Sequence, residues 1–266
     1  MKTLKLILPI LIAALLLPLQ TKAQEQIAVP LTNPGEPGQL NVNVIHGSVT
    51  VTGYDGNEVL ISYSGGDNED QQKVTEEGLR RISSNSVGFQ VSEDNNEVTI
   101  SGVSPMQPVD FEISVPQNFS LNLSAVNGEL LVKNVSGEME LSSVNGEINL
   151  LGVNGSALVN TVNGDITAVF DEVPPNAPMA FTNLNGDIDV TLPADVQMTA
   201  KMKSEWGEVF TDFEMNINRA SENPELSTEN GVYKVSVNNW IYGTVNGGGP
   251  EYLFKSMRGD IYIRKK

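Results

Sequence analysis

Short runs of alternating apolar and polar residues fill most of the chain, and each run starts behind a glycine. After Gly128, apolar residues stand two, four and seven positions later, at Leu130, Val132 and Val135, and the same offsets recur after Gly146. Residues two apart share one face of a β-strand. The pattern therefore predicts a strand with one buried face behind each glycine.

The glycines recur at a constant step of nine residues. The regular array consists of Gly128, Gly137, Gly146, Gly155 and Gly164. Looser copies are centred on Gly47, Gly186, Gly207, Gly247 and Gly259. Asparagine precedes several of the glycines, at Asn127, Asn145, Asn163 and Asn185. Because Asn-Gly readily adopts left-handed backbone angles, we expect these pairs to form the corners between strands.

This alternation of strand and corner predicts an all-β fold. A nine-residue unit cannot bury its apolar face alone, but units wound into a coil place each strand about 4.8 Å from its counterpart one coil away. We therefore predict a single-stranded parallel β-solenoid, β-helix-like, with two or more units in each coil. A meander of antiparallel hairpins is the alternative, because Asn-Gly is also a hairpin signal. The constant offset between each glycine and its apolar residues favours the solenoid.

Three segments of different character divide the chain. They are a signal peptide at 1–23, an extended leader at 24–38 and a β-solenoid repeat domain at 39–266, with polar excursions near 66–83, 171–180 and 214–231. Lys2 and Lys5 precede an apolar run that ends near the small residue Ala23, which is typical of a secretory signal. No second long apolar run follows. We expect export to the periplasm, the cell surface or the medium, without a membrane-spanning segment after signal removal.

Composition excludes several kinds of chemistry. The chain has no cysteine and a single histidine, His46. Disulfides, thiolate ligands, histidine clusters for zinc and a cysteine nucleophile are therefore excluded, and no serine stands in a context that indicates a Ser-His-Asp triad. The formal net charge of −17 disfavours nucleic acid and anionic lipid as partners. We expect no cofactor.

Acidic residues directly follow several corner glycines and suggest a weak calcium hypothesis. The candidates are Glu129, Glu147, Asp165 and Asp187. Stacked along one edge of a solenoid, these carboxylates would repel one another unless water and salt screen them or a divalent cation bridges them. Since the chain lacks the glycine-aspartate nonapeptide of calcium-binding β-rolls, we favour solvated acids.

Two further patterns have structural interpretations. The recurrent asparagines are expected to hydrogen-bond along the coil axis as a ladder. Aromatic residues gather late in the chain, at Trp206, Trp240, Tyr242, Tyr252, Phe254 and Tyr262. Exposed rings would suit stacking on sugars, but their alternation favours packing inside the last coils. The Arg-Gly-Asp tripeptide at 258–260 is interpreted as the corner of its own repeat.

Three places in the chain resemble one known family. They are 47–59, with the sequence GSVTVTGYDGNEV, the Val-Asn-Gly-Glu/Asp-Ile array, and Asn246-Gly247-Gly248-Gly249-Pro250 followed by Gly259-Asp260-Ile261-Tyr262-Ile263. Together they resemble the bacterial putative adhesin domain of unknown function, a family of exported β-strand-repeat proteins. The resemblance covers nearly all of the chain after residue 23. It implies a β-solenoid at the cell envelope, and it assigns no activity and no functional residues.

The favoured function is a non-enzymatic exported envelope or surface protein, an adhesin-like or scaffold module whose partner is an envelope polymer or protein. Divalent cations are a further candidate partner. The alternative is a carbohydrate-active enzyme, a glycoside hydrolase or polysaccharide lyase, that uses paired carboxylates on a β-helix.

Overall fold

The structure, a computed structural model, describes residues 26–65, 88–103, 105, 107–219, 225–229, 232–236 and 240–266. Every regular element in these residues is a β-strand. The predicted signal peptide and the excursion near 66–83 lie outside the described residues. Within those residues, no helix is long and apolar enough to cross a membrane.

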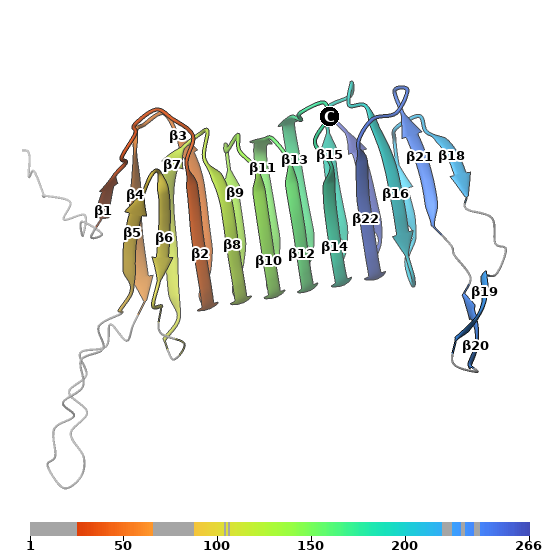
Figure 1. The fold of residues 1–266 in the computed structure, drawn as a ribbon, viewed down its shortest axis with the longest axis horizontal. Helices are drawn as coiled ribbons and strands as arrows, with labels where there is room; N and C mark the ends of the chain where they lie inside the picture. The colour runs from red at the N-terminus through yellow and green to blue at the C-terminus, as the bar shows by residue number, and fades with distance from the viewer. Residues whose placement is uncertain are drawn as a thin grey trace, which may run out of the picture.

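Two long sheets face each other (Figure 1). The first contains, in spatial order, β1 (Gln26–Pro30), β4 (Glu58–Gly65), β7 (Val109–Pro116), β3 (Val49–Tyr54), β9 (Leu130–Lys133), β11 (Ile148–Asn154), β13 (Ile166–Glu172), β15 (Ile188–Leu192), β23 (Ile261–Lys265) and β17 (Val209–Thr211). The second contains β18 (Asn216–Arg219), β21 (Ile241–Val245), β16 (Met198–Ser204), β22 (Glu251–Arg258), β14 (Met179–Asn185), β12 (Ala157–Asn163), β10 (Met139–Asn145), β8 (Ser120–Asn127), β2 (Gln39–His46), β6 (Glu97–Ser101) and β5 (Gln90–Asp94). A separate hairpin pairs β19 (Glu225–Glu229) with β20 (Val232–Ser236).

The regular array alternates between the two sheets, one strand in each, so two units complete one coil. Leu123 on β8 pairs with Leu141 on β10, and Leu141 pairs with Val159 on β12, all in parallel. These steps of 18 residues are twice the predicted unit of nine. The antiparallel meander is therefore wrong for the array. Antiparallel pairs occur only toward the ends of the two sheets, as in β1 with β4 and β16 with β21.

The coils are not stacked in chain order at either end. The coil of β2 and β3 lies between that of β6 and β7 and that of β8 and β9. The coil of β22 and β23 likewise lies between that of β14 and β15 and that of β16 and β17. The continuous winding expected from the repeat is thus interrupted at both ends. The structure is solenoid-like, with two mostly parallel sheets and inserted terminal coils.

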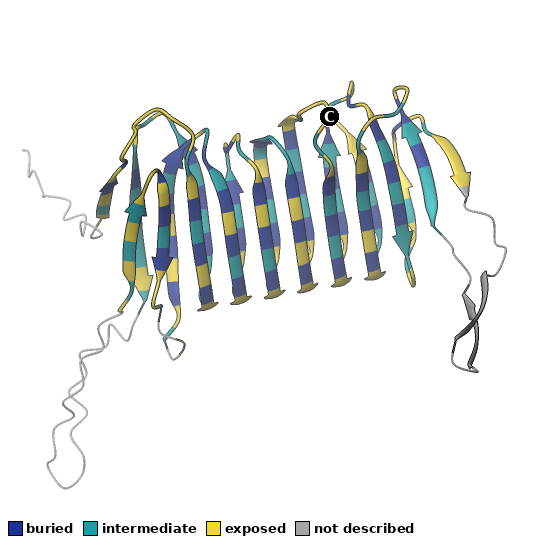
Figure 2. Ribbon diagram, viewed as in Figure 1, coloured by how far each residue is buried: buried dark blue, intermediate teal, exposed yellow. Residues whose placement is uncertain are grey.

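The core lies between the sheets and follows the predicted alternation. On β10, Met139 and Leu141 are buried while Glu140 between them is exposed, and the same banding runs along neighbouring strands (Figure 2). Near the C-terminal coils the core contains aromatic rings: Phe181 stacks on Phe254 at 5.5 Å and meets Phe170 edge-on at 6.1 Å. Both sheets contribute, as the offset behind each glycine indicated.

Corner glycines are required mainly because neighbouring coils approach closely. A Cβ added to Gly146 would overlap the carbonyl oxygen of Gly128, and one added to Gly164 would overlap that of Gly146. Gly186 also has a positive φ of 122°, whereas Gly128 and Gly146 do not have positive φ. The prediction of left-handed angles at every Asn-Gly corner is therefore wrong for Gly128 and Gly146, where space rather than backbone angle requires glycine.

The remaining predicted segments contain both loops and strands. In the leader, β1 pairs with β4 as an edge strand. In the excursion at 171–180, residues 173–178 form a loop between β13 and β14, and the remaining residues belong to the ends of these two strands. The excursion at 214–231 contains β18 and β19, and β18 pairs with β21.

Candidate functional site

The strands of the second sheet end in line along one edge of the molecule, at the bottom of Figure 1. We call this the corner edge, because the chain turns there from the second sheet to the first at Gly47, Gly128, Gly146, Gly164, Gly186, Gly259 and Gly207. The tight corners repeat the same short sequence in successive coils, so they place equivalent side chains in columns along the edge.

An asparagine ladder forms the first column. The Nδ2 of Asn145 donates to the Oδ1 of Asn127 at 2.9 Å, that of Asn163 to Asn145 at 2.8 Å, and that of Asn185 to Asn163 at 2.7 Å. At one end, the Nδ2 of Asn127 lies 3.3 Å from the Nδ1 of His46. The amides are thus used along the coil axis, and they stiffen the edge.

A row of exposed aliphatic side chains runs beside the ladder, one residue before it in each coil. This aliphatic stripe consists of Ile45, Val126, Val144, Val162, Leu184 and Met257, all between 37% and 41% exposed. Strand register places them on six consecutive strands of the second sheet, β2, β8, β10, β12, β14 and β22. The sequence pattern did not single out these positions as an exposed row.

The corner acids form a third column. The backbone N–H of Asp187 donates to the Oδ1 of Asp165 at 2.8 Å, that of Asp260 to Asp187 at 2.8 Å, and that of Glu208 to Asp260 at 2.9 Å. Glu129 and Glu147 are exposed in the same column, and the carbonyl of Glu147 accepts from Leu130 N–H. Aspartate is short enough to bind the backbone of the next coil.

The aspartates of this column, Asp165, Asp187 and Asp260, therefore have a structural role. Within the described residues, no group of three or more His, Asp or Glu side chains is placed to hold a metal ion. The carboxylate of Asp260 accepts from Glu208 N–H and from the Tyr262 hydroxyl at 3.1 Å. The tripeptide at 258–260 is therefore part of the column.

A fourth, inward-facing column was not predicted from the sequence. Three residues before five of the corner glycines, a buried or half-buried polar side chain faces the corner from within: Ser143, Thr161, Asn183, Ser256 and Ser204. The Thr161 hydroxyl donates to the carbonyl of Gly146 at 3.2 Å, and that of Ser204 donates to Gly259 at 2.8 Å. The signal was present as Ser, Thr or Asn at a fixed distance before glycine.

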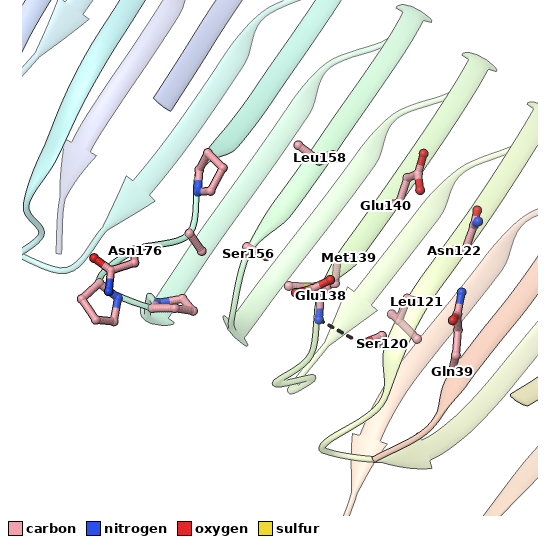
Figure 3. A pocket seen from close by; sticks show the side chains of 14 residues that line it. Gln39, Ser120, Leu121, Asn122, Glu138, Met139, Glu140, Ser156, Leu158 and Asn176 are labelled. Atoms are coloured by element: carbon pink, nitrogen blue, oxygen red, sulfur yellow. Dashed lines mark hydrogen bonds between the residues drawn. The ribbon is translucent and has the colours of Figure 1, made fainter. Parts of the chain in front are cut away.

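A hollow of about 720 Å³ lies on the outer face of the second sheet, under the loop at 173–178 (Figure 3). Its walls include Glu138, Glu140, Leu158 and Asn176. Glu138 directly precedes β10 and Glu140 is its second residue, so both carboxylates are exposed on one segment of the chain beside this hollow. Glycosidases instead place two carboxyl groups on either side of the scissile bond.

A second hollow of about 590 Å³ lies on the same face near the C-terminal coils. Trp206, in the corner between β16 and β17, forms one wall and is 78% exposed. The other lining residues are Asn160, Thr161, Thr182, Asn183, Leu184, Glu205, Leu253, Lys255 and Met257. The expectation that the late aromatic residues pack in the last coils is confirmed for Tyr252 and Phe254, which are fully buried, and is wrong for Trp206.

Exposed aromatic rings also lie on the outer face of the first sheet. Phe210 stacks on Tyr262 at 5.1 Å, and the Arg264 guanidinium lies 5.0 Å from the Tyr262 ring. The hydrogen bond to Asp260 raises the pKa of Tyr262. Two hydrogen bonds of 2.8 Å and one of 3.0 Å from Arg264 to Asp189 raise the pKa of the guanidinium. These residues join β15, β23 and β17 from outside.

Together, the fold and the corner edge define a repeat-built β-protein with long periodic surfaces. The chain belongs to the Toastrack family DUF4097, whose model matches residues 38–246. This confirms the resemblance to an adhesin-like domain of unknown function. A comparison with curated proteins found no match.

Two solved structures are similar over most of their length. A putative cell adhesion protein from Clostridium sporogenes ATCC 15579 is 16% identical, with 91% of this chain and 99% of that one covered and a TM-score of 0.40. A putative adhesin from Bacteroides fragilis NCTC 9343 is 11% identical, with 91% and 96% covered and a TM-score of 0.31. At these values the likeness supports no inference about function.

Proposed function

We propose that this chain is a non-enzymatic, exported, adhesin-like module of a bacterial cell envelope. In this proposal it is a β-solenoid that binds an extended envelope polymer or protein along the corner edge and the adjoining outer face of the second sheet. The observation that carries the proposal is the aliphatic stripe, six side chains about 40% exposed in register on six consecutive strands.

Physical chemistry supports a binding role for this edge. Contiguous exposed apolar side chains are uncommon on soluble proteins unless they meet a partner. Here they lie beside the asparagine ladder, whose Asn–Asn hydrogen bonds of 2.7–2.9 Å hold the edge straight. Each coil would contribute a small equivalent contact, and the contacts would add along an extended ligand.

The described surface supports catalysis less well. Glu138 and Glu140 line one hollow from the same segment of the chain, and His46 lies at the corner edge beside Asn127. A hydrolase or lyase needs carboxylates placed around the scissile bond. We therefore expect binding without turnover.

The test uses the secreted protein and envelope fractions from the producing cell. Wild type should sediment with a fraction, and the double variant Val144→Ser and Val162→Ser should lose most of this binding. Both side chains are already partly exposed, so the variant should fold. The matched control Leu151→Ser changes a side chain that is 38% exposed on the first sheet and should bind as wild type does.

The same incubations distinguish the alternative function. New reducing or unsaturated sugar ends that increase with time would overturn the non-enzymatic proposal in favour of the carbohydrate-active enzyme.

N-terminal sequencing tests the predicted signal cleavage. The exported protein should start near Gln24, and a chain that retains residue 1 would contradict the cleavage.

A further inference from the structure

We infer that the hollow beside Trp206 binds a pyranose ring of an envelope glycan. This inference rests on the proposed binding function and gives it a ligand class, since the hollow continues the aliphatic stripe at Leu184 and Met257. Trp206 carries the argument, since an indole that is 78% exposed leaves a large apolar ring in water without contributing to the core. Such a ring is typically retained where it meets a partner.

Trp206 stands at the position that asparagine occupies in the corner ladder of four other coils. Hydrogen bonds hold the backbone of its corner in place. The Ser204 hydroxyl accepts from Gly207 N–H at 2.9 Å and donates to the Gly259 carbonyl at 2.8 Å, and Glu208 N–H donates to Asp260 at 2.9 Å. A ring held on a rigid corner loses little conformational freedom when a ligand stacks on it.

The remaining walls fit a sugar. Leu184, Leu253 and Met257 form an apolar part of the lining, suited to the C–H face of a pyranose. Asn160 and Thr182 supply an amide and a hydroxyl, and in the part of the chain that the structure describes neither side chain makes a hydrogen bond within the protein. A volume of about 590 Å³ lies within the ordinary range for small-ligand sites.

The local charge also suits a glycan better than a cationic ligand. Glu205 is paired with Lys203, so its carboxylate is compensated. Lys255 then provides the one cationic group in the lining, able to donate to a sugar hydroxyl or to a uronate carboxylate. Neutral and acidic sugars share the pyranose ring, and their separate binding constants would show whether Lys255 selects between them.

The experiment titrates neutral and uronate hexasaccharides into the Trp240→Phe variant, in which Trp206 is the only tryptophan. We expect at least one series to change the Trp206 fluorescence saturably. By calorimetry, Trp206→Ala should weaken binding of that series about tenfold or more. Trp206→Tyr should retain most of it. Phe210→Ala, which removes another exposed ring from the opposite sheet, should bind as wild type does.

Each outcome decides the matter. Equal affinity of wild type and Trp206→Ala would overturn the inference and leave the proposed function standing, with the glycan bound elsewhere. Binding of envelope fractions without any hexasaccharide binding would also overturn the inference alone. Failure of both envelope fractions and hexasaccharides to bind would overturn the inference together with the proposed function.

Discussion

Gly146 lies where two coils approach closely along the corner edge, and it has no room for a side chain. A Cβ there would overlap the carbonyl oxygen of Gly128. Gly146→Ala should therefore lower the free energy of unfolding by roughly 3 kcal/mol, because the backbone of one coil must move away from the next. Urea denaturation followed by circular dichroism measures this.

The control separates close approach from backbone angle. Gly247 has a φ of +90°, and a Cβ added there would meet no atom within 4 Å. Gly247→Ala should cost only about 1 kcal/mol, the ordinary cost of a left-handed alanine. Equal losses in the two variants would contradict the argument from space.

Asn145 takes part in two rungs of the asparagine ladder, as donor to Asn127 and as acceptor from Asn163. Asn145→Ala should lower stability by about 1–2 kcal/mol, since both neighbouring amides lose a partner. Asn122 is exposed on the outer face of the same sheet, and Asn122→Ala should change stability by less than about 0.5 kcal/mol. Thermal melts of both variants test this, and an unchanged melting temperature for Asn145→Ala would show that water replaces the ladder.

For single residues, the sequence showed where the corners lie but did not show why each corner requires glycine. The Asn-Gly step located the corners, and the stacked amides follow from their equal spacing. The need for glycine at Gly128 and Gly146 arises from the neighbouring coil, which local turn preferences do not contain. Trp206 was misjudged for a related reason, because its position in the corner rather than in a strand decides its exposure.

Strand β22 belongs to an inserted coil. It pairs with β14 on one side and with β16 on the other, although it follows both in the chain. Its Phe254 is fully buried and stacks on Phe181. Phe254→Ala should cost about 3–5 kcal/mol. It should also speed hydrogen exchange in both β14 and β16, as measured by mass spectrometry.

Phe210→Ala, on β17, is the matched control for Phe254→Ala. Its ring is stacked on Tyr262 but 42% exposed on the outer face, so the cost should be below about 1 kcal/mol. If hydrogen exchange after Phe254→Ala became faster in β22 alone, the claim that this inserted coil stabilises both neighbouring coils would be wrong.

The loop before β2 is held to the hairpin of β5 and β6 by Glu93. Its Oε1 accepts from the N–H groups of Thr32 and Asn96, both at 2.9 Å, and these bonds lower the Glu93 pKa below its usual 4.5. A lowered folded-state pKa contributes stability that is complete above pH 4.5 and is lost as pH falls through the folded value. The stability difference between wild type and Glu93→Gln should therefore shrink below pH 4.5. A difference constant from pH 7 to 3 would argue against this carboxylate as the cause.

The order of the strands was not predictable from the repeat. Gly47 and Gly259 each approach a carbonyl of the neighbouring coil as closely as the glycines inside the array do, so the corner glycine does not mark a coil as inserted. The nine-residue period fixes which residues face inward and how two paired strands align residue by residue. It carries no information on whether a terminal coil is added at the end or inserted one place earlier.

Over the whole molecule, acidic charge is in excess, with a formal net charge of −17. The corner acids add to this by stacking along one edge, where Asp165, Asp187 and Asp260 already accept backbone N–H groups from the next coil. Any salt screens the remaining repulsion. We therefore expect the melting temperature to rise with ionic strength and to rise equally in calcium chloride and sodium chloride of the same ionic strength.

A specific cation site would behave differently, because binding to the folded state alone adds stability that saturates with ligand concentration. Calorimetric melts across a calcium series at fixed ionic strength distinguish the two cases. Glu147→Gln and Asp187→Asn should leave the calcium response unchanged, although Asp187→Asn weakens the bond to Asp260 N–H. A saturable rise with calcium that both variants abolish would instead assign the edge acids, Glu129, Glu147, Asp165 and Asp187, to a metal site.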